Sequence, residues 1–176
     1  MSKVKAAELD EKKDINSYLS FKLGEEYFAV NVDQVIEILE VPAITKIPRA
    51  PGYMAGVINL RGNVLPLIDT RIKFNMDPIQ MTVNTCVVVI EINVEGESLQ
   101  IGTLVDEVLE VLEIDKNQIQ PSPSIEAQYK LDFIEGMFRK DEDFIMLLNL
   151  GAVFSLTEVN FMQETNEAVE SAEQNN

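Results

Sequence analysis

The chain carries one β-rich pattern twice, and this internal duplication limits its fold more than any other sequence feature. Residues 32–40 match residues 105–113 in their apolar and acidic positions, at an offset of 105 − 32 = 73. Residues 65–69 match residues 145–149 at an offset of 145 − 65 = 80. The difference of 80 − 73 = 7 indicates about seven extra residues in the second copy, in or near 121–132, where a Pro-Ser-Pro-Ser run marks a loop.

The two copies are short. The approximate repeats, 18–74 and 85–154, each contain about five runs with the alternation or the β-branched composition of a strand. A repeat of this length cannot build a large core alone, but it is long enough for a small barrel. We therefore predict an all-β fold: two similar five-stranded β-barrels packed side by side along an apolar seam, with short helices only, in one domain over residues 15–156.

Local signals refine the first repeat. Residues 32–40 have the pattern of a short turn followed by a strand. Pro51 could begin one helical turn over residues 51–55. Asp69 or Thr70 has the character of an N-cap for a short helical segment.

The two ends of the chain lack the β pattern. Residues 1–14 are polar and charged, and we expect a mobile N-terminal arm. Residues 157–176 are rich in Glu, Asn and Gln, and we expect a short helix, a disordered acidic tail, or both. Since no apolar run approaches the ~20 residues that cross a bilayer, the sequence favours a soluble, cytoplasmic protein.

The charge of the chain argues against two classes of partner. Thirty acidic and 14 basic residues give a formal net charge of −16. A field of this sign repels phosphate backbones and anionic lipid surfaces, so we expect no nucleic-acid partner and no direct membrane insertion.

The chain offers little catalytic chemistry. It has no histidine, which removes the commonest general base and most zinc sites. It also has no glycine-rich phosphate loop. The best carboxylate pairs, Asp33 with Glu37 and Asp106 with Glu110, occur in both repeats, which favours a structural role. We predict no catalytic residue, no metal and no cofactor, so a binding protein is the leading class.

One hairpin contains an unexpected cation. Two apolar runs flank a turn in residues 56–69, and this turn holds Arg61 in a strongly acidic chain. Arg61 is either a solvated turn residue or a contact residue presented beside an apolar surface. The equivalent hairpin of the second repeat, residues 136–143, lacks the Asn-Leu-Arg-Gly sequence, so the fold requires the hairpin without requiring that sequence. This asymmetry favours a contact role for Arg61.

The run of residues 44–71, which includes the Asn-Leu-Arg-Gly sequence, closely resembles the signature of the CheW-like domain family of chemotaxis coupling proteins. Residues 102–112, 119–123 and 146–150 add to this resemblance, which spans about 18–154. It implies two five-stranded barrels of SH3-like form. It also implies a non-catalytic adaptor that couples methyl-accepting chemotaxis receptors to the histidine kinase CheA, in arrays at the inner face of the membrane.

The resemblance also implies two sets of contact residues. The residues matched to receptor binding are Glu37, Gly56, Asn59, Arg61, Cys86, Val87 and Gly102, of which Cys86, Val87 and Gly102 would line a groove between the barrels. The residues matched to binding of the regulatory domain of CheA are Leu19, Val32, Val35, Gln120, Pro121 and Ile125, the first three as an exposed apolar strip. Some relatives carry a cation and an aromatic residue at the positions of Gln120 and Ile125, a departure that weakens the case for a second kinase interface.

Three alternatives are open. Two stay within the family: the coupling domain of a CheV-like protein, or a detached CheA regulatory domain. Such domains normally belong to chains with a receiver or kinase module, and the 176 residues contain neither, so we expect a stand-alone coupler. The third is a small carboxylate enzyme or metabolite-binding barrel, in which Asp33 or Asp106 would be required.

Overall fold

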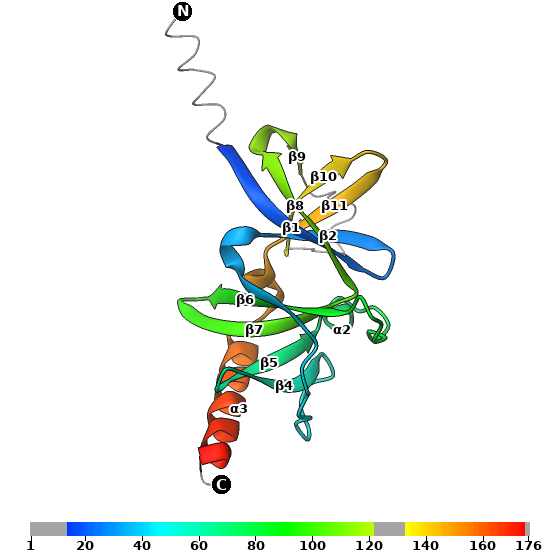
Figure 1. Cartoon of the computed structure of the whole chain (residues 1–176). Helices are drawn as coiled ribbons and strands as arrows, with labels where there is room; N and C mark the ends of the chain where they lie inside the picture. The colour runs from blue at the N-terminus through cyan, green and yellow to red at the C-terminus, as the bar shows by residue number, and fades with distance from the viewer. Residues whose placement is uncertain (1–13, 122–132, 175–176) are drawn as a thin grey trace, which may run out of the picture.

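Two curved β-sheets account for most of the described chain, residues 14–121 and 133–174 of a computed structural model (Figure 1). The strands are β1 (Ile15–Leu23), β2 (Glu26–Asn31), β3 (Val35–Glu40), β4 (Met54–Leu60), β5 (Asn63–Asp69), β6 (Cys86–Val94), β7 (Glu97–Val105), β8 (Glu107–Asp115), β9 (Ile119–Gln120), β10 (Ile134–Lys140) and β11 (Asp143–Leu148). The helices are η2 (Val32–Gln34), α2 (Thr70–Lys73), η3 (Lys116–Gln118), η4 (Leu150–Val153) and α3 (Leu156–Gln174). The predicted all-β fold with two barrels is confirmed.

The barrels do not coincide with the repeats. One sheet, which we call barrel A, has the order β8-β1-β2-β11-β10-β9, and the other, barrel B, has the order β3-β6-β7-β5-β4. Each barrel thus joins the first hairpin of one repeat to the later strands of the other repeat. We expected each repeat to form its own barrel; instead the two repeats exchange their first hairpins, as Figure 1 shows.

The strand registers repeat at the two offsets found in the sequence. Gly56 lies opposite Leu67, and Gly136 lies opposite Leu147, each next to an irregularity in its hairpin, at an offset of 136 − 56 = 80. The parallel contacts repeat as well, since Leu67 pairs with Gly102 as Leu147 pairs with Ala29, where 102 − 29 = 73. The two barrels are therefore built from equivalent parts with the same pairings.

The largest apolar core joins the two barrels. It combines buried residues of β1 and β2 with buried residues of β6 and β7, for example Phe21 and Phe28 with Ile90 and Ile101. The opposite face of β6 fills barrel B with Val87 and Val89. Because both faces of β6 are covered over residues 87–90, this part of its sequence is a continuous apolar run, whereas Glu91 and Asn93 beyond it are exposed.

A partly buried ion pair also ties the barrels together. Asp106 lies where the chain passes from β7 of barrel B to β8 of barrel A, and its Oδ2 accepts a hydrogen bond of 2.7 Å from Nε of Arg71 in α2. The same oxygen accepts a 2.6 Å hydrogen bond from the backbone N–H of Gly24, in the β1–β2 turn. The hydrogen bond with Asp106 raises the pKa of Arg71 above its usual value.

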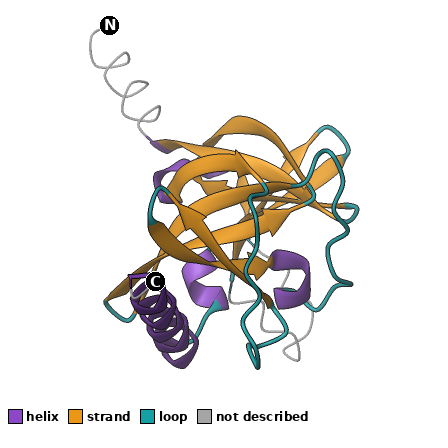
Figure 2. Cartoon of the chain, turned by 60° about the horizontal axis from the view of Figure 1, so that its bottom comes forward, coloured by secondary structure: helices purple, strands orange, loops and turns teal. Residues whose placement is uncertain are grey.

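The helices lie at the periphery of the strands (Figure 2). Asp69 caps α2, since its Oδ1 accepts a hydrogen bond from the N–H of Ile72 at 3.3 Å, as predicted. Residues 32–40 form η2 and β3, also as predicted. Residues 51–54 form a single hydrogen-bonded turn, in which the N–H of Met54 donates to the carbonyl oxygen of Pro51 at 2.9 Å, but no helix follows, since β4 begins at Met54 and pairs with β5.

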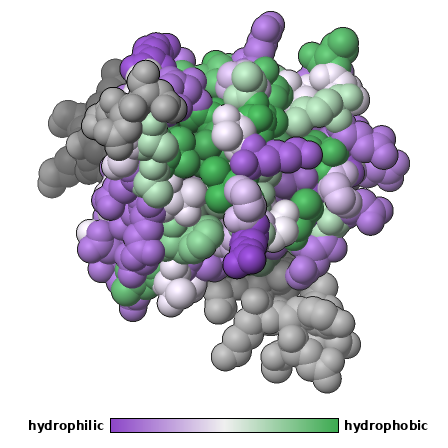
Figure 3. Space-filling view, turned by 90° about the horizontal axis from the view of Figure 1, so that it is seen from below, coloured by the Kyte–Doolittle hydropathy of each residue, from purple (hydrophilic) through white to green (hydrophobic). Residues whose placement is uncertain are grey.

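Helix α3 packs on strands β5 and β7 of barrel B. It is 19 residues long and extends beyond the short terminal helix that the sequence suggested. Its residues Val159 and Met162 are fully buried in the core that joins the barrels, and its Glu158 pairs with Lys73 of α2 at 2.6 Å. The lower end of the molecule, formed by barrel B and α3, exposes apolar side chains among hydrophilic ones (Figure 3). The expected N-terminal arm, the insertion at 122–132 and Ile125 lie outside the described residues, apart from Asp14 at the end of the arm.

Candidate functional site

The predicted hairpin around Arg61 is strands β4 and β5, joined by the two-residue turn Arg61-Gly62. Both turn residues have positive φ angles, 51° for Arg61 and 87° for Gly62. A two-residue turn of this kind matches the twist of the strands that it joins. The N–H of Gly62 donates a 2.9 Å hydrogen bond to Oδ1 of Asn59, so Asn59 braces the turn from within.

A carboxylate on β3, at the other end of the strand order of barrel B from β4, fixes the Arg61 guanidinium. Nη1 and Nη2 of Arg61 donate hydrogen bonds of 2.9 and 2.7 Å to Oε2 and Oε1 of Glu37, in β3. The Glu37 side chain is 22% exposed while that of Arg61 remains 73% exposed. The two-point contact restricts the guanidinium without covering it, which leaves donor groups available to a partner.

Two exposed apolar side chains accompany this pair. Ile36 and Ile38, on either side of Glu37, are 44% and 45% exposed, and the β3–β6 register shifts between Val35 and Glu37. Sequence reasoning did not select these isoleucines. Glu40 was the signal that could have found them, since Ile36, Ile38 and Glu40 share one face of the strand, opposite the face that carries Glu37.

Gly56 is buried and supports the hairpin from below. Its φ is +148°, and a Cβ atom built there would lie 2.3 Å from the carbonyl oxygen of Thr45. Thr45 and Val57 exchange backbone hydrogen bonds of 2.9 and 2.8 Å, which hold the segment before β4 against it. Gly56 therefore lies beneath the hairpin that carries Arg61. There it supports the position of Arg61 and is not exposed to a partner.

Two of the expected groove residues lie in the interior. Val87 is fully buried inside barrel B, and a Cβ on Gly102 would meet side chains of Val87, Leu67 and Ile58 within 3.3 Å. The expectation that they line a groove between the barrels was wrong, because both pack toward the interior of barrel B. Cys86 is half-buried, and its thiol donates to the carbonyl oxygen of Asn84 at 3.2 Å.

The expected kinase-binding residues differ in their exposure and lie in different parts of the fold. Leu19 is 4% exposed within the core that joins the barrels, so it is not part of an exposed strip, contrary to expectation. Val32 and Val35 are half-buried against the same core. Gln120 and Pro121 are exposed at the end of β9, in barrel A.

The carboxylate pairs do not form a catalytic arrangement. Asp106 is occupied by Arg71 and Gly24, while Glu37 is occupied by Arg61. In the part of the chain that the structure describes, no three His, Cys, Asp or Glu side chains gather as metal ligands would. Nor is any described helix both long and apolar enough to cross a membrane.

A two-barrel β-protein that presents a braced arginine, with exposed isoleucines on the strand of its partner glutamate, has the features of a protein-interaction module. Comparison with known proteins gives the family: the model of the CheW-like domain matches residues 17–158. The chain belongs to the CheW-like domain family.

Individual relatives agree. A probable chemotaxis protein CheW of Rhizobium etli is 36% identical over 140 residues, covering 80% of this chain and 88% of the relative. A chemotaxis protein CheW of Klebsiella aerogenes is 30% identical over 142 residues, covering 81% and 83%. Among solved structures, the scaffolding protein TtCheW from Thermoanaerobacter tengcongensis matches with a TM-score of 0.70 and 29% identity, over 81% of this chain and 94% of that one.

Proposed function

We propose that this chain is a non-catalytic adaptor that couples methyl-accepting chemotaxis receptors to the histidine kinase CheA, at receptor arrays on the inner face of the membrane. Family membership supports the adaptor class. The observation that carries the proposal is the Arg61–Glu37 pair, because it holds an exposed guanidinium in a fixed orientation, and the strand of Glu37 also carries exposed isoleucines.

The receptor is the partner that we assign to this pair. Arg61, Glu37 and Asn59 form the polar part of the surface, and Ile36 and Ile38 form its apolar part. Gly56, Val87 and Gly102 contribute through packing beneath it. A rigid cation beside apolar side chains is the type of contact that dominates the energy of protein interfaces.

The kinase is assigned to other surfaces. Gln120 and Pro121 are exposed in barrel A, away from the Arg61 hairpin of barrel B, and Val32 and Val35 are partly accessible at the junction of the barrels. Separate surfaces allow both partners to bind at the same time, as coupling requires.

Co-sedimentation tests the proposal. The full chain is mixed with CheA and with membranes that carry a methyl-accepting chemotaxis receptor, and the bound fraction is measured. Arg61→Ala is expected to weaken receptor-dependent sedimentation about tenfold, the effect of losing an interface contact of about 1.4 kcal/mol. Arg139→Ala is the matched control, because Arg139 is an exposed arginine on the equivalent hairpin of barrel A. Equal binding by both variants would refute the role of Arg61.

A further inference from the structure

Barrel A repeats the Arg61 site with its charges rearranged. Leu109 and Glu110 of β8 stand at the positions of Ile36 and Glu37, since 109 − 36 = 73 and 110 − 37 = 73. Leu109 is 40% exposed, close to the 44% of Ile36. The strand also has the same irregularity, because the β1–β8 register shifts between Leu19 and Phe21, opposite this pair.

The glutamate of barrel A also bonds to a cation on the facing hairpin. Nζ of Lys140, at the end of β10, pairs with Oε1 of Glu110. Both side chains are partly exposed, 40% for Lys140 and 51% for Glu110. An edge-strand glutamate bridged to a hairpin cation is therefore present once in each barrel, although no sequence motif marks the second instance.

The charges at the hairpin turns differ between the barrels. The offset of 80 places Asp141 at the position of Arg61, and both residues have a left-handed backbone, with φ of 55° and 51°. Where barrel B presents a guanidinium, barrel A thus presents a carboxylate. The two equivalent sites thus share the backbone conformation of the turn and differ in the charge of its first residue.

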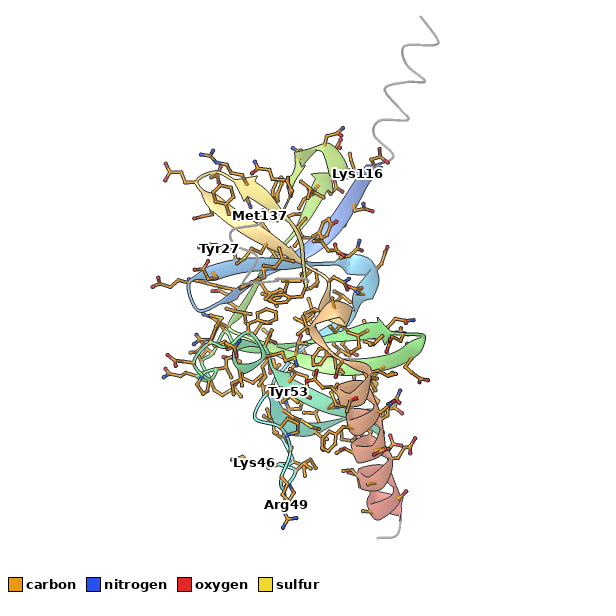
Figure 4. The ribbon with its side chains drawn as sticks, turned by 180° about the vertical axis from the view of Figure 1, so that it is seen from behind. Tyr27, Lys46, Arg49, Tyr53, Lys116 and Met137 are labelled. Atoms are coloured by element: carbon orange, nitrogen blue, oxygen red, sulfur yellow. The ribbon has the colours of Figure 1, made fainter. Side chains whose placement is uncertain are left out.

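The site in barrel A is hollowed. A depression of about 260 Å³ lies between β8 and the β10–β11 hairpin, lined by Ser20, Tyr27, Leu109, Glu110, Lys140, Asp141, Asp143 and Ile145. Tyr27 lies in the upper barrel, at the opposite end of the molecule from Lys46 and Arg49 (Figure 4). Three carboxylates and one ammonium group give this lining a formal charge of 1 − 3 = −2.

The walls of the depression suit a long cationic side chain. Leu109, Ile145 and the ring of Tyr27 supply apolar surface for an aliphatic stem, and Asp141 and Asp143 supply acceptors for its charged head. Lys140 is already neutralised by Glu110. Electrostatic complementarity therefore selects a positively charged partner here.

We propose that this depression in barrel A is a second docking site, which binds a segment of a protein partner that carries lysine or arginine beside apolar residues. The site adds to the proposed adaptor function, but it does not depend on receptor contact at Arg61. The duplicated chain thus presents two equivalent sites of opposite charge, one for each of two chemically different partners.

Titration of the labelled full chain with a model peptide tests the proposal. The probe is a twelve-residue peptide of alternating lysine and valine, and chemical shifts of ¹⁵N-labelled protein report where it binds. The largest shifts are expected at residues 109–110 and 140–145. A peptide of alternating glutamate and valine is expected to produce none of them. Shifts confined to other surfaces, or equal shifts with both peptides, would overturn the proposal.

Charge-matched variants separate a built site from the general attraction of an acidic protein. Asp141→Asn with Asp143→Asn should weaken binding of the lysine peptide about fivefold or more, because it removes two of the negative charges that attract the cation. Asparagine tolerates the left-handed backbone of position 141, so folding should be retained. Glu95→Gln with Glu97→Gln removes the same charge at the β6–β7 turn, away from the depression. It should change the affinity for the lysine peptide by less than twofold, which we count as no effect. Equal losses in the two double variants would overturn the proposal.

Two further measurements test the apolar wall of the depression and the alternative that a second copy of the chain occupies it. Leu109→Ser should also weaken peptide binding, which a purely electrostatic contact would not show. If the chain instead associates with itself and Asp141→Asn with Asp143→Asn abolishes that association, the occupant is a second copy and the proposed partner class is wrong. Arg61→Ala should leave peptide binding unchanged, so failure of the adaptor proposal and failure of this one are distinguishable.

Discussion

Barrels A and B share their strand pairings and differ in what surrounds their equivalent sites. In barrel B the edge glutamate, Glu37, holds an arginine that remains largely exposed, and helix α3 packs on the barrel. In barrel A the edge glutamate, Glu110, holds Lys140 beside a hollow with a negative lining. Duplication preserved the backbone geometry of the site while its side chains changed independently.

The difference shows which parts of the site belong to the fold. The glycine under each hairpin, Gly56 or Gly136, occurs in both barrels, as does the glutamate on the edge strand. The exposed cation at the turn occurs in barrel B alone, because its counterpart is Asp141. The shared glycines are therefore expected to affect stability, and the unshared turn residues to affect binding.

The largest expected effect comes from the glycines. Gly56→Ala should destabilise the fold by ~3 kcal/mol, because its Cβ would lie 2.3 Å from a backbone oxygen and its φ of +148° is unfavourable for alanine. Gly136→Ala should cost less, ~1–2 kcal/mol, since the nearest backbone oxygen is 2.9 Å from the Cβ. Urea unfolding followed by circular dichroism measures both. A greater loss for Gly136→Ala would contradict the comparison.

The next effect concerns the tie between the barrels. Asp106→Ala should destabilise by ~2 kcal/mol, because it leaves the partly buried Arg71 without its carboxylate and Gly24 without an acceptor. Asp33→Ala, the equivalent change at an offset of 106 − 33 = 73, should cost under ~0.5 kcal/mol, because Asp33 is exposed. Thermal unfolding of both variants tests this; similar losses would mean that Asp106 does not fasten the barrels.

A smaller, pH-dependent effect is expected at α3, which packs on barrel B. Burial would raise the pKa of Glu158, but hydrogen bonds from Lys73 and from the backbone N–H of Ser155 outweigh it and lower that pKa. Because the folded-state pKa is below the ordinary value of 4.5, the ion pair stabilises the protein above pH 4.5 and this contribution is lost as the pH falls through the lowered pKa.

Comparison of variants isolates this contribution. Glu158→Gln should reduce stability by ~1 kcal/mol at pH 7, and the gap from the unmodified chain should close in acid. Glu164→Gln, on an exposed position of the same helix, should be neutral. Urea midpoints at several pH values give the result, and a gap that persists in acid would rule out the ion pair as its cause.

The sequence predicted the parts of this fold better than their assembly. The hairpins, η2 with β3, the Asp69 cap and the duplication follow from local patterns. The exchange of hairpins does not, because equivalent repeats offer the same edges and registers to either partner. The sequence also does not show that Val87 of β6 faces the interior of barrel B. Val87 was therefore assigned to a groove, although it is fully buried.

The site shows the same limit. Arg61, Asn59 and Glu37 were selected by resemblance, and the structure joins all three around one hairpin. The pair Glu110–Lys140 was missed because the cation moved one position along the chain, from the turn to the end of β10. Matching the repeats position by position makes Asp141 the equivalent of Arg61, so it does not reveal the Glu110–Lys140 ion pair.

The smallest effects on stability are expected at the two bridges themselves. Arg61→Ala and Lys140→Ala should each change the free energy of unfolding by less than ~0.5 kcal/mol, because exposed ion pairs contribute little in water. Urea unfolding of both variants checks this. Binding should separate them: Arg61→Ala should weaken receptor sedimentation, while Lys140→Ala should strengthen binding of the lysine peptide, since it removes the one cation from the hollow of barrel A. If Lys140→Ala weakens that binding instead, Lys140 is itself the contact and the opposed charge of the two barrels is not what selects their partners.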